Sequence, residues 1–199
     1  MDTISIKKNG LEVMCDIGLE TDGYATPFTH PFEGQYYLQV PCIKQAKGSL
    51  QCWAACIASI RGYYGTSTTI DEVYDMSDVL KYNGANVFDV SNTLERFGFN
   101  VNCSWGRYSW LSLRNAIYYN GTPIYGHIGY TDDDAHAVVI RGYDVNQRES
   151  SVGLGLISYM APADGAYCTS IVYNDYEFIY VPSSTSTPYT IEAFLEVIN

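Results

Sequence analysis

Residues 45–56 have the sequence Gln45-Ala46-Lys47-Gly48-Ser49-Leu50-Gln51-Cys52-Trp53-Ala54-Ala55-Cys56. A polar loop leads here into Cys52, and the apolar residues that follow have helical spacing, which predicts a helix over 52–64 that stops at Gly65. A cysteine at a helix N-terminus lies beside free backbone N–H groups and the positive end of the helix dipole, which stabilise a thiolate. Cys52 is therefore the candidate nucleophile, and Cys56, one turn deeper, is the weaker candidate.

A nucleophilic cysteine needs a base close by, and the chain has three histidines. One of them begins the run His136-Ala137-Val138-Val139-Ile140-Arg141-Gly142-Tyr143-Asp144, which predicts a buried strand with the imidazole held at its mouth. His127 falls in the middle of another predicted strand, where we expect a core or cleft-wall residue. His30 lies in a proline-rich loop, and we assign it no role.

The predicted elements around these residues segregate along the chain. Strands are predicted for Thr3–Lys8 and Leu11–Ile17 around the hairpin signal Asn9-Gly10, for Tyr36–Val40, and, in the second half, for Pro123–Tyr130, His136–Tyr143, Gly155–Met160 and Thr169–Val181. Further helices are predicted over 69–81, 86–97 and 109–120, with a closing helix over Thr190–Ile198, while 20–35 and Pro182–Pro188 are predicted to be loop and linker. Helices first and a sheet later indicate an α+β fold.

Composition excludes several function classes. The 199 residues include 22 acidic and 11 basic side chains, giving a formal net charge of −11, which disfavours nucleic acids and anionic membranes as partners. No apolar stretch approaches the ~20 residues that span a bilayer, and the N-terminus lacks the pattern of a signal peptide. The six cysteines match no zinc spacing, and we expect most of them to be small buried residues. We expect neither metal nor cofactor, and interpret Asp132-Asp133-Asp134 as a solvated turn rather than a calcium site, with an influence on the charge of the cleft as the alternative.

These motifs together resemble a papain-like cysteine peptidase. The segments that carry the resemblance are Gln45, Cys52-Trp53-Ala54-Ala55, Gly62-Tyr63-Tyr64-Gly65, Gly121-Thr122-Pro123-Ile124 and His136 with the strand after it. Within that superfamily the chain is most similar to the bacterial branch of bacteriocin-leader (double-glycine) peptidases, over roughly Val40–Val181. The resemblance implies a helical subdomain, carrying the nucleophile, packed on an antiparallel sheet that carries the catalytic histidine.

The resemblance also implies roles for individual residues. Cys52 matches the nucleophile, His136 the general base and acid, and Gln45 the glutamine of the oxyanion hole, with Gln51 as a rival for that role. The family's third catalytic residue is an Asp or Asn, usually followed by Pro, but Ala161 precedes Pro162 at the matching place. Asp164 is the candidate replacement; the alternatives are a Cys–His dyad or an inactive site.

The sequence therefore predicts a thiol-dependent peptidase of bacterial origin, secreted and monomeric, that hydrolyses a peptide or protein through a thioester. Acyl transfer or deamidation by the same Cys–His pair is one alternative, and a non-catalytic peptide-binding module on the same fold is another. Residues 36–199 are the predicted peptidase domain, and 1–35 are predicted to be a propeptide remnant or an accessory segment.

Overall fold

The computed structural model describes residues 2–8, 11–17, 34–106, 108–131, 134–145, 154–174, 177–180 and 189–199. The chain divides into two compact units, Met1–Glu33 and Gly34–Asn199. In the first, strands β1 (Asp2–Lys8) and β2 (Leu11–Ile17) pair antiparallel, with Lys8 opposite Leu11. Because only two residues separate the strands, the hairpin predicted from Asn9-Gly10 is confirmed. The role of residues 1–35 as a propeptide or accessory segment stays a prediction.

The second unit is built on an antiparallel sheet that closes into a ring. The members of the sheet are β3 (Gln35–Tyr37), β4 (Asn100–Trp105), β5 (Ile124–Thr131), β6 (Asp134–Asp144), β7 (Gly155–Ala161), β8 (Ala166–Asn174), β9 (Glu177–Tyr180) and β10 (Tyr189–Ile198). The strand order β6–β5–β10–β9–β8–β7 returns to β6 through the β6–β7 pairing, while β3 adds to β6 and β4 to β10. A closed sheet leaves few exposed edges, and both faces of β6 are buried.

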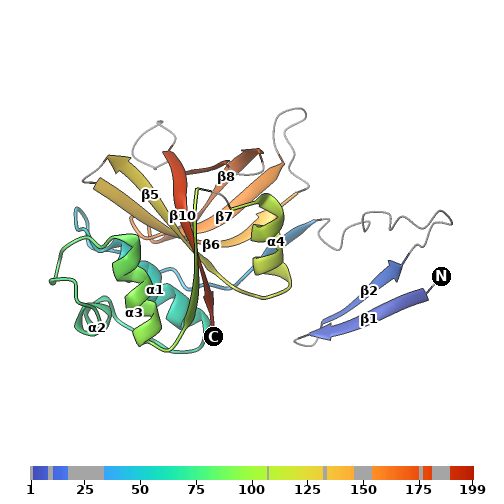
Figure 1. The fold of residues 1–199 in the computed structure, drawn as a ribbon, viewed down its shortest axis with the longest axis horizontal. Coiled ribbons are helices and arrows are strands. Elements are labelled where there is room, and N and C mark those ends of the chain that lie inside the picture. The colour runs from blue at the N-terminus through green and yellow to red at the C-terminus, as the bar shows by residue number, and fades with distance from the viewer. Residues whose placement is uncertain are drawn as a thin grey trace. The chain divides into compact units, whose positions relative to one another are not determined.

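Four helices accompany this sheet: α1 (Cys52–Tyr63), α2 (Ile70–Met76), α3 (Val87–Arg96) and α4 (Trp110–Tyr118). Helices α1, α2 and α3 contact one another and gather on one side of the strands, whereas α4 lies against β3 and β6 (Figure 1). All of the first nine residues of α1 are buried, as expected for a helix that is apolar on every side. The contact between α1 and β6 is the largest between a helix and a strand, so it connects the two predicted parts of the site.

Two predicted elements are wrong, and one strand was not predicted. Residues 190–198 form strand β10 rather than a helix, because Ile191, Ala193, Leu195 and Val197 are buried at every second position between β4 and β5. The strand predicted for Thr169–Val181 is two strands, β8 and β9, which pair with each other. Strand β4 was not predicted; Val101, Cys103 and Trp105 alternate with polar residues in its sequence Asn-Val-Asn-Cys-Ser-Trp, and it pairs with β10 outside the main strand order.

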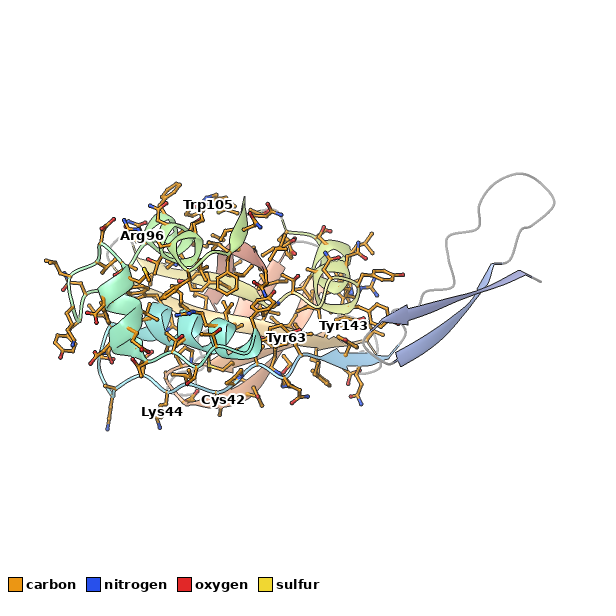
Figure 2. All side chains as sticks on the ribbon, turned by 90° about the horizontal axis from the view of Figure 1, so that it is seen from below. Cys42, Lys44, Tyr63, Arg96, Trp105 and Tyr143 are labelled. Carbon is orange, nitrogen blue, oxygen red and sulfur yellow. The ribbon has the colours of Figure 1, made fainter. Side chains whose placement is uncertain are left out.

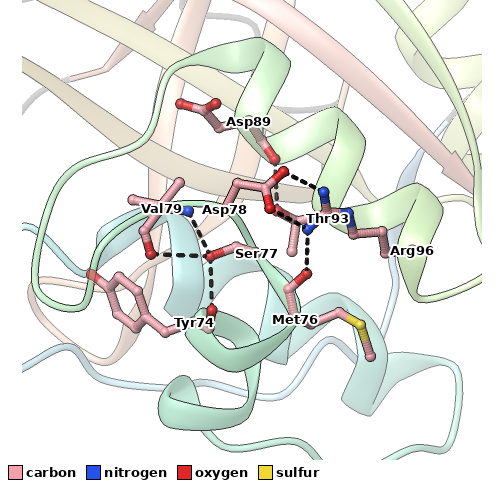
Figure 3. A network of polar contacts seen from close by, with 8 residues as sticks. All are labelled: Tyr74, Met76, Ser77, Asp78, Val79, Asp89, Thr93 and Arg96. Carbon is pink, nitrogen blue, oxygen red and sulfur yellow. Dashed lines mark hydrogen bonds and ion pairs between the residues drawn. The ribbon is translucent and has the colours of Figure 1, made fainter.

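Helix α2 ends at Met76, five residues before the predicted end at residue 81. Ser77 adopts an extended backbone, and its hydroxyl donates to Tyr74 O at 3.0 Å and accepts from Val79 N at 3.2 Å (Figure 3). Arg96 of α3 then donates to Met76 O at 3.0 Å and forms a two-pronged ion pair with Asp78. This pairing lowers the pKa of the Asp78 carboxyl. Local polar contacts therefore stop the helix and start the connection from 77 to 86.

The N-terminus of α3 has a capping box at Asn86, the residue at which the sequence predicted the start of this helix. Asn86 Oδ1 accepts from Phe88 N at 2.9 Å and Asp89 N at 3.0 Å, and Asp89 Oδ2 accepts from Asn86 N at 3.1 Å. The cap thus satisfies backbone donors that the first turn leaves without partners.

We predict that Asn86→Ala lowers the free energy of unfolding by about 1 kcal/mol, since the two backbone donors lose their acceptor. Urea unfolding measures this as a lower midpoint at unchanged slope. Asn92→Ala, at an exposed position within the same helix, is the matched control and is expected to be neutral or slightly stabilising. Equal midpoints for the two variants would contradict the role of the cap.

Candidate active site

A cavity of about 520 Å³ lies where the N-terminus of α1 meets β5, β6 and β10. Cys52 and Trp53 line it from α1, His127 and Gly129 from β5, and His136 from β6. The connection between α2 and α3 contributes Gly84, Ala85 and Asn86 to the opposite wall, and β10 contributes Glu192. The structure thus brings Cys52 and His136, which are 84 positions apart in the chain, to one cavity.

Cys52 is the first residue of α1, at the place that the sequence predicted. Its side chain is 9% exposed, and the N-cap residue Gln51 uses no side-chain bond to cap the helix. The backbone N–H groups of the first turn therefore remain available to an anion at this end. This is the environment that favours a cysteine thiolate.

Trp53 holds the cavity wall beside Cys52 in place. Its indole is 1% exposed, packs edge-on against Tyr74 at 5.0 Å between ring centroids, and donates from Nε1 to Asn83 O at 3.1 Å. The Tyr74 hydroxyl donates to the same carbonyl at 2.9 Å. Trp53 therefore packs on Tyr74 and anchors the connection that supplies Gly84 and Asn86.

His136 is 8% exposed and lies opposite Ile128 in the β5–β6 pair. Its neighbours Ala135 and Ala137 also line the cavity. Because successive side chains of a strand alternate between faces, three consecutive lining residues show that the cavity wraps around this end of β6. The histidine is thus at the mouth of a buried strand, as the sequence predicted.

Cys56 lies one turn deeper in α1 and is fully buried. Burial, and then the negative charge of an ionised Cys52, raise the pKa of the Cys56 thiol well above its ordinary value. Cys56 is therefore the poorer nucleophile of the two. Among the described cysteines only Cys52 and Cys56 are buried, whereas Cys42 and Cys103 are exposed, so the expectation of mostly buried cysteines is wrong.

Gln45 lies in the segment before α1, outside the residues that line the cavity. Its Nε2 donates to Ser49 O at 2.8 Å, while its Oε1 is buried without a partner among the described residues. Backbone bonds from Gln45 N to Pro162 O at 3.0 Å and from Leu38 N to Arg141 O at 2.7 Å tie the segment to the sheet. Figure 2 shows Cys42 and Lys44 along the outer edge of this segment.

Gln51, the rival of Gln45, is 7% exposed. Its Oε1 accepts a long hydrogen bond from Ala46 N at 3.4 Å, which closes the polar loop onto itself. One hydrogen on Gln45 Nε2 remains unused by the Ser49 bond, since a primary amide has two. The role of Gln45 stays a prediction.

Asp164 lies in the turn between β7 and β8, outside the residues that line the cavity. Its backbone N–H donates to Ala161 O at 3.2 Å, and its carboxylate contributes to the raised pKa of Cys168. Ala161 itself is fully buried at the end of β7. The part that Asp164 plays in catalysis stays a prediction. The interpretation of Asp132-Asp133-Asp134 as a solvated turn also stays a prediction, because residues 132 and 133 lie outside the described residues.

Sequence reasoning did not single out Tyr125 and Glu192, both of which line the cavity. Tyr125 is fully buried, and its hydroxyl has no partner among the described residues. Burial raises the pKa of this phenol, as do ionised Cys56 and Cys52. No local sequence motif marks either residue, because it is the pairing of β5 with β10, two strands distant in sequence, that brings them to the cavity.

Over the described part of the chain, no cluster of three His, Cys, Asp or Glu residues is arranged to hold a metal ion. Within the same residues, none of the helices combines the length and apolar character needed to cross a bilayer.

Residues 39–149 match the sequence model of the peptidase C39 family, and this segment is more than half of the chain. The chain belongs to the peptidase C39 family. The matched segment contains Gln45, Cys52 and His136. No curated protein is similar enough in sequence to be matched to it.

Two solved structures are similar to this member of the C39 family. One is the peptidase domain of Streptococcus ComA, a bifunctional ABC transporter of a quorum-sensing pathway, with 14% identity, a TM-score of 0.51, and coverage of 80% of this chain and 98% of that domain. The other is a double-glycine motif protease from an AMS/PCAT transporter in complex with a leader peptide, with 17% identity, a TM-score of 0.49, and coverage of 81% and 93%. The predicted papain-like α+β fold and the resemblance to the bacteriocin-leader branch are confirmed.

The half-buried imidazole of His127 generates a prediction about stability. Burial lowers the pKa of His127 from its ordinary value of 6.5. As pH falls through about 6.5, the unfolded chain takes up a proton at this position that the folded chain does not. The unfolded state therefore gains stability relative to the folded state as the pH decreases.

We expect His127→Gln to weaken this acid sensitivity, so that the difference in unfolding free energy between pH 7.5 and pH 5.5 is smaller than in the unmodified chain. Urea titrations at the two pH values measure it. Identical pH dependence in both proteins would show that His127 titrates normally when folded.

Proposed function

We propose that this chain is a thiol-dependent peptidase in which Cys52 is the nucleophile and His136 is the general base and acid. The observation that carries the proposal is that one cavity, in a chain of the C39 family, is lined by a cysteine at a helix N-terminus and by a histidine at a strand end. Amide hydrolysis through a thioester needs a nucleophilic thiol and a base at a common substrate site.

The proposed reaction begins with attack of the Cys52 thiolate on the scissile carbonyl carbon. Backbone N–H groups at the start of α1 and the Gln45 amide stabilise the oxyanion, and His136 gives a proton to the leaving amine. A thioester remains on Cys52. Water, deprotonated by His136, attacks the thioester, releases the acid product and restores the thiolate–imidazolium pair.

We predict that Cys52→Ala abolishes cleavage of a pool of quenched fluorescent peptides. We also predict that, in the unmodified chain, iodoacetamide at pH 6 labels Cys52 faster than any other cysteine, because an imidazolium partner and the helix dipole favour its thiolate. Peptide mass mapping identifies the labelled residue. The matched variant Cys103→Ala removes an exposed cysteine whose pKa is raised by partial burial and is expected to retain full activity. Faster labelling at another cysteine would overturn the assignment of Cys52.

Gln45 is tested separately from Cys52. If its amide donates to the oxyanion, Gln45→Ala lowers kcat about 10²–10³-fold with little change in KM. Gln39→Ala, at an exposed position in the same segment, is the control and leaves kcat unchanged. A normal kcat in Gln45→Ala, together with a loss in Gln51→Ala at unchanged stability, would move the oxyanion role to Gln51.

A second candidate function is a peptide-binding module without catalysis. The observation that favours it is Ala161, a fully buried alanine where the resemblance places a carboxylate or amide acceptor for the histidine. Slow labelling of Cys52 at pH 6, combined with tight peptide binding, would support this function instead.

A further inference from the structure

The cavity extends beyond Cys52 and His136 onto one face of the β5–β6 pair. Gly129 lies opposite Ala135, and His127 lies opposite Ala137, so these four residues share a face. All four line the cavity, and we call them the cavity floor. Three of the four have a methyl group or no side chain, which leaves room for a substrate side chain above them.

Glu192 is directed to this floor by an irregularity in β10. Ile191 lies opposite Ile128, but Ala193 lies opposite His127, so β10 has one residue more than β5 at this point. Glu192 is that extra residue, in a β-bulge. A bulge changes the direction of a side chain without ending the strand, and bulges are frequent next to active sites.

The absence of a side chain at Gly129 permits the position of the Glu192 carboxylate. A methyl group at position 129 would lie 2.5 Å from Glu192 Oε2 and 2.9 Å from its Cδ. The carboxylate therefore lies directly over the backbone of β5. There it makes no hydrogen bond or ion pair with any residue that the structure describes.

Glu192 is an exposed residue of the cavity lining, and no opposite charge of the described lining lies beside its carboxylate. None of the described residues that line the cavity is a lysine or an arginine. Burial lowers the pKa of His127, so this imidazole is neutral at pH 7 and does not offset the carboxylate. Two buried polar atoms of the lining, Tyr125 Oη and His127 Nδ1, also have no partner within the described chain. Buried polar groups without partners are costly, which favours a polar ligand at this place.

We propose that Glu192 determines substrate specificity by pairing with the ammonium or guanidinium group of a lysine or arginine in the peptide. The proposal rests on the proposed peptidase function. Gly129 is one strand spacing of ~4.8 Å from Ala135, the residue before His136, and a peptide advances ~3.3 Å per residue. The basic residue therefore lies within about three residues of the scissile bond.

The first test is cleavage of a mixture of synthetic peptides of defined sequence, with the products read by mass spectrometry. The unmodified chain is expected to prefer Lys or Arg about fivefold at one position within three residues of the cut. Glu192→Gln loses this preference, and Glu192→Lys replaces it with a preference for Asp or Glu. Glu95→Gln changes the net charge equally at an exposed position outside the cavity lining, and is expected to keep the preference.

The same basic preference in the unmodified chain and in Glu192→Gln, or no basic preference in the unmodified chain, would overturn the proposal. Retention in Glu192→Gln with loss in Glu95→Gln would likewise overturn it and would indicate general attraction by the acidic surface.

The second test does not depend on cleavage. Random dodecapeptides displayed on phage are selected on Cys52→Ala, on Cys52→Ala/Glu192→Gln and on Cys52→Ala/Glu95→Gln. Enrichment of Lys or Arg at a fixed place in the first and third selections, and its loss in the second, supports the subsite. If no protein cleaves any peptide but this enrichment is found, the proposed peptidase function fails and the Glu192 subsite stands; equal enrichment in all three selections overturns the subsite.

Discussion

The packing of α1 against β6 is the constraint on which the rest of the molecule depends. Helix α1 is buried over its first nine residues, so its position is fixed by neighbours on every side. Strand β6 pairs with β3, β5 and β7 and is equally enclosed. The candidate nucleophile Cys52 lies at the start of one buried element and His136 lies near the start of the other, so the packing of the two elements places both side chains at the same cavity. The free energy gained by burying the apolar core offsets the conformational entropy that is lost when the site is ordered. This is the general advantage of placing reactive groups at the ends of buried elements.

The other walls of the cavity depend on weaker and more local contacts. The connection from 77 to 86 is held at its start by the Arg96–Asp78 pair and near its end by hydrogen bonds from Trp53 and Tyr74 to Asn83 O. The Arg96–Asp78 pair is solvent-exposed, and such pairs contribute little to stability. Trp53 adds a buried aromatic contact to the same task, so the residue after the candidate nucleophile connects helix α1 to the facing wall. On the other side, the β-bulge at Glu192 adds a charged group to a cavity whose floor consists of Gly129, Ala135 and Ala137 together with His127.

Much of the site was predictable because its signals are local. Short-range preferences for dipole, capping and burial account for the helix over 52–63 with its start at Cys52, for the helix starts near Thr69 and Asn86, and for the strand that begins near His136. The errors arose where neighbours override such preferences. Residues 190–198 have helix-forming and strand-forming residues alike, and only pairing with β4, β5 and β9 decides that they form β10. The early end of α2 depends on Arg96, which lies 18 positions after Asp78 in the chain.

The sequence by itself determined the kind of chemistry: a cysteine at a helix start, a histidine at a strand start, and an acidic chain whose motifs resemble papain-like peptidases. The helix start and the strand start are each encoded by residues that are close together in the sequence, and the net charge follows from composition alone. The tertiary structure alone decided that Cys52 and His136 line the same cavity, that Gln45 and Asp164 stand outside its lining, and that Glu192 enters it. These relations join strands that are far apart in sequence, and one extra residue in β10 reverses which side chains face the cavity. Because strand register is fixed by the packing of the whole sheet, no short stretch of sequence contains that information.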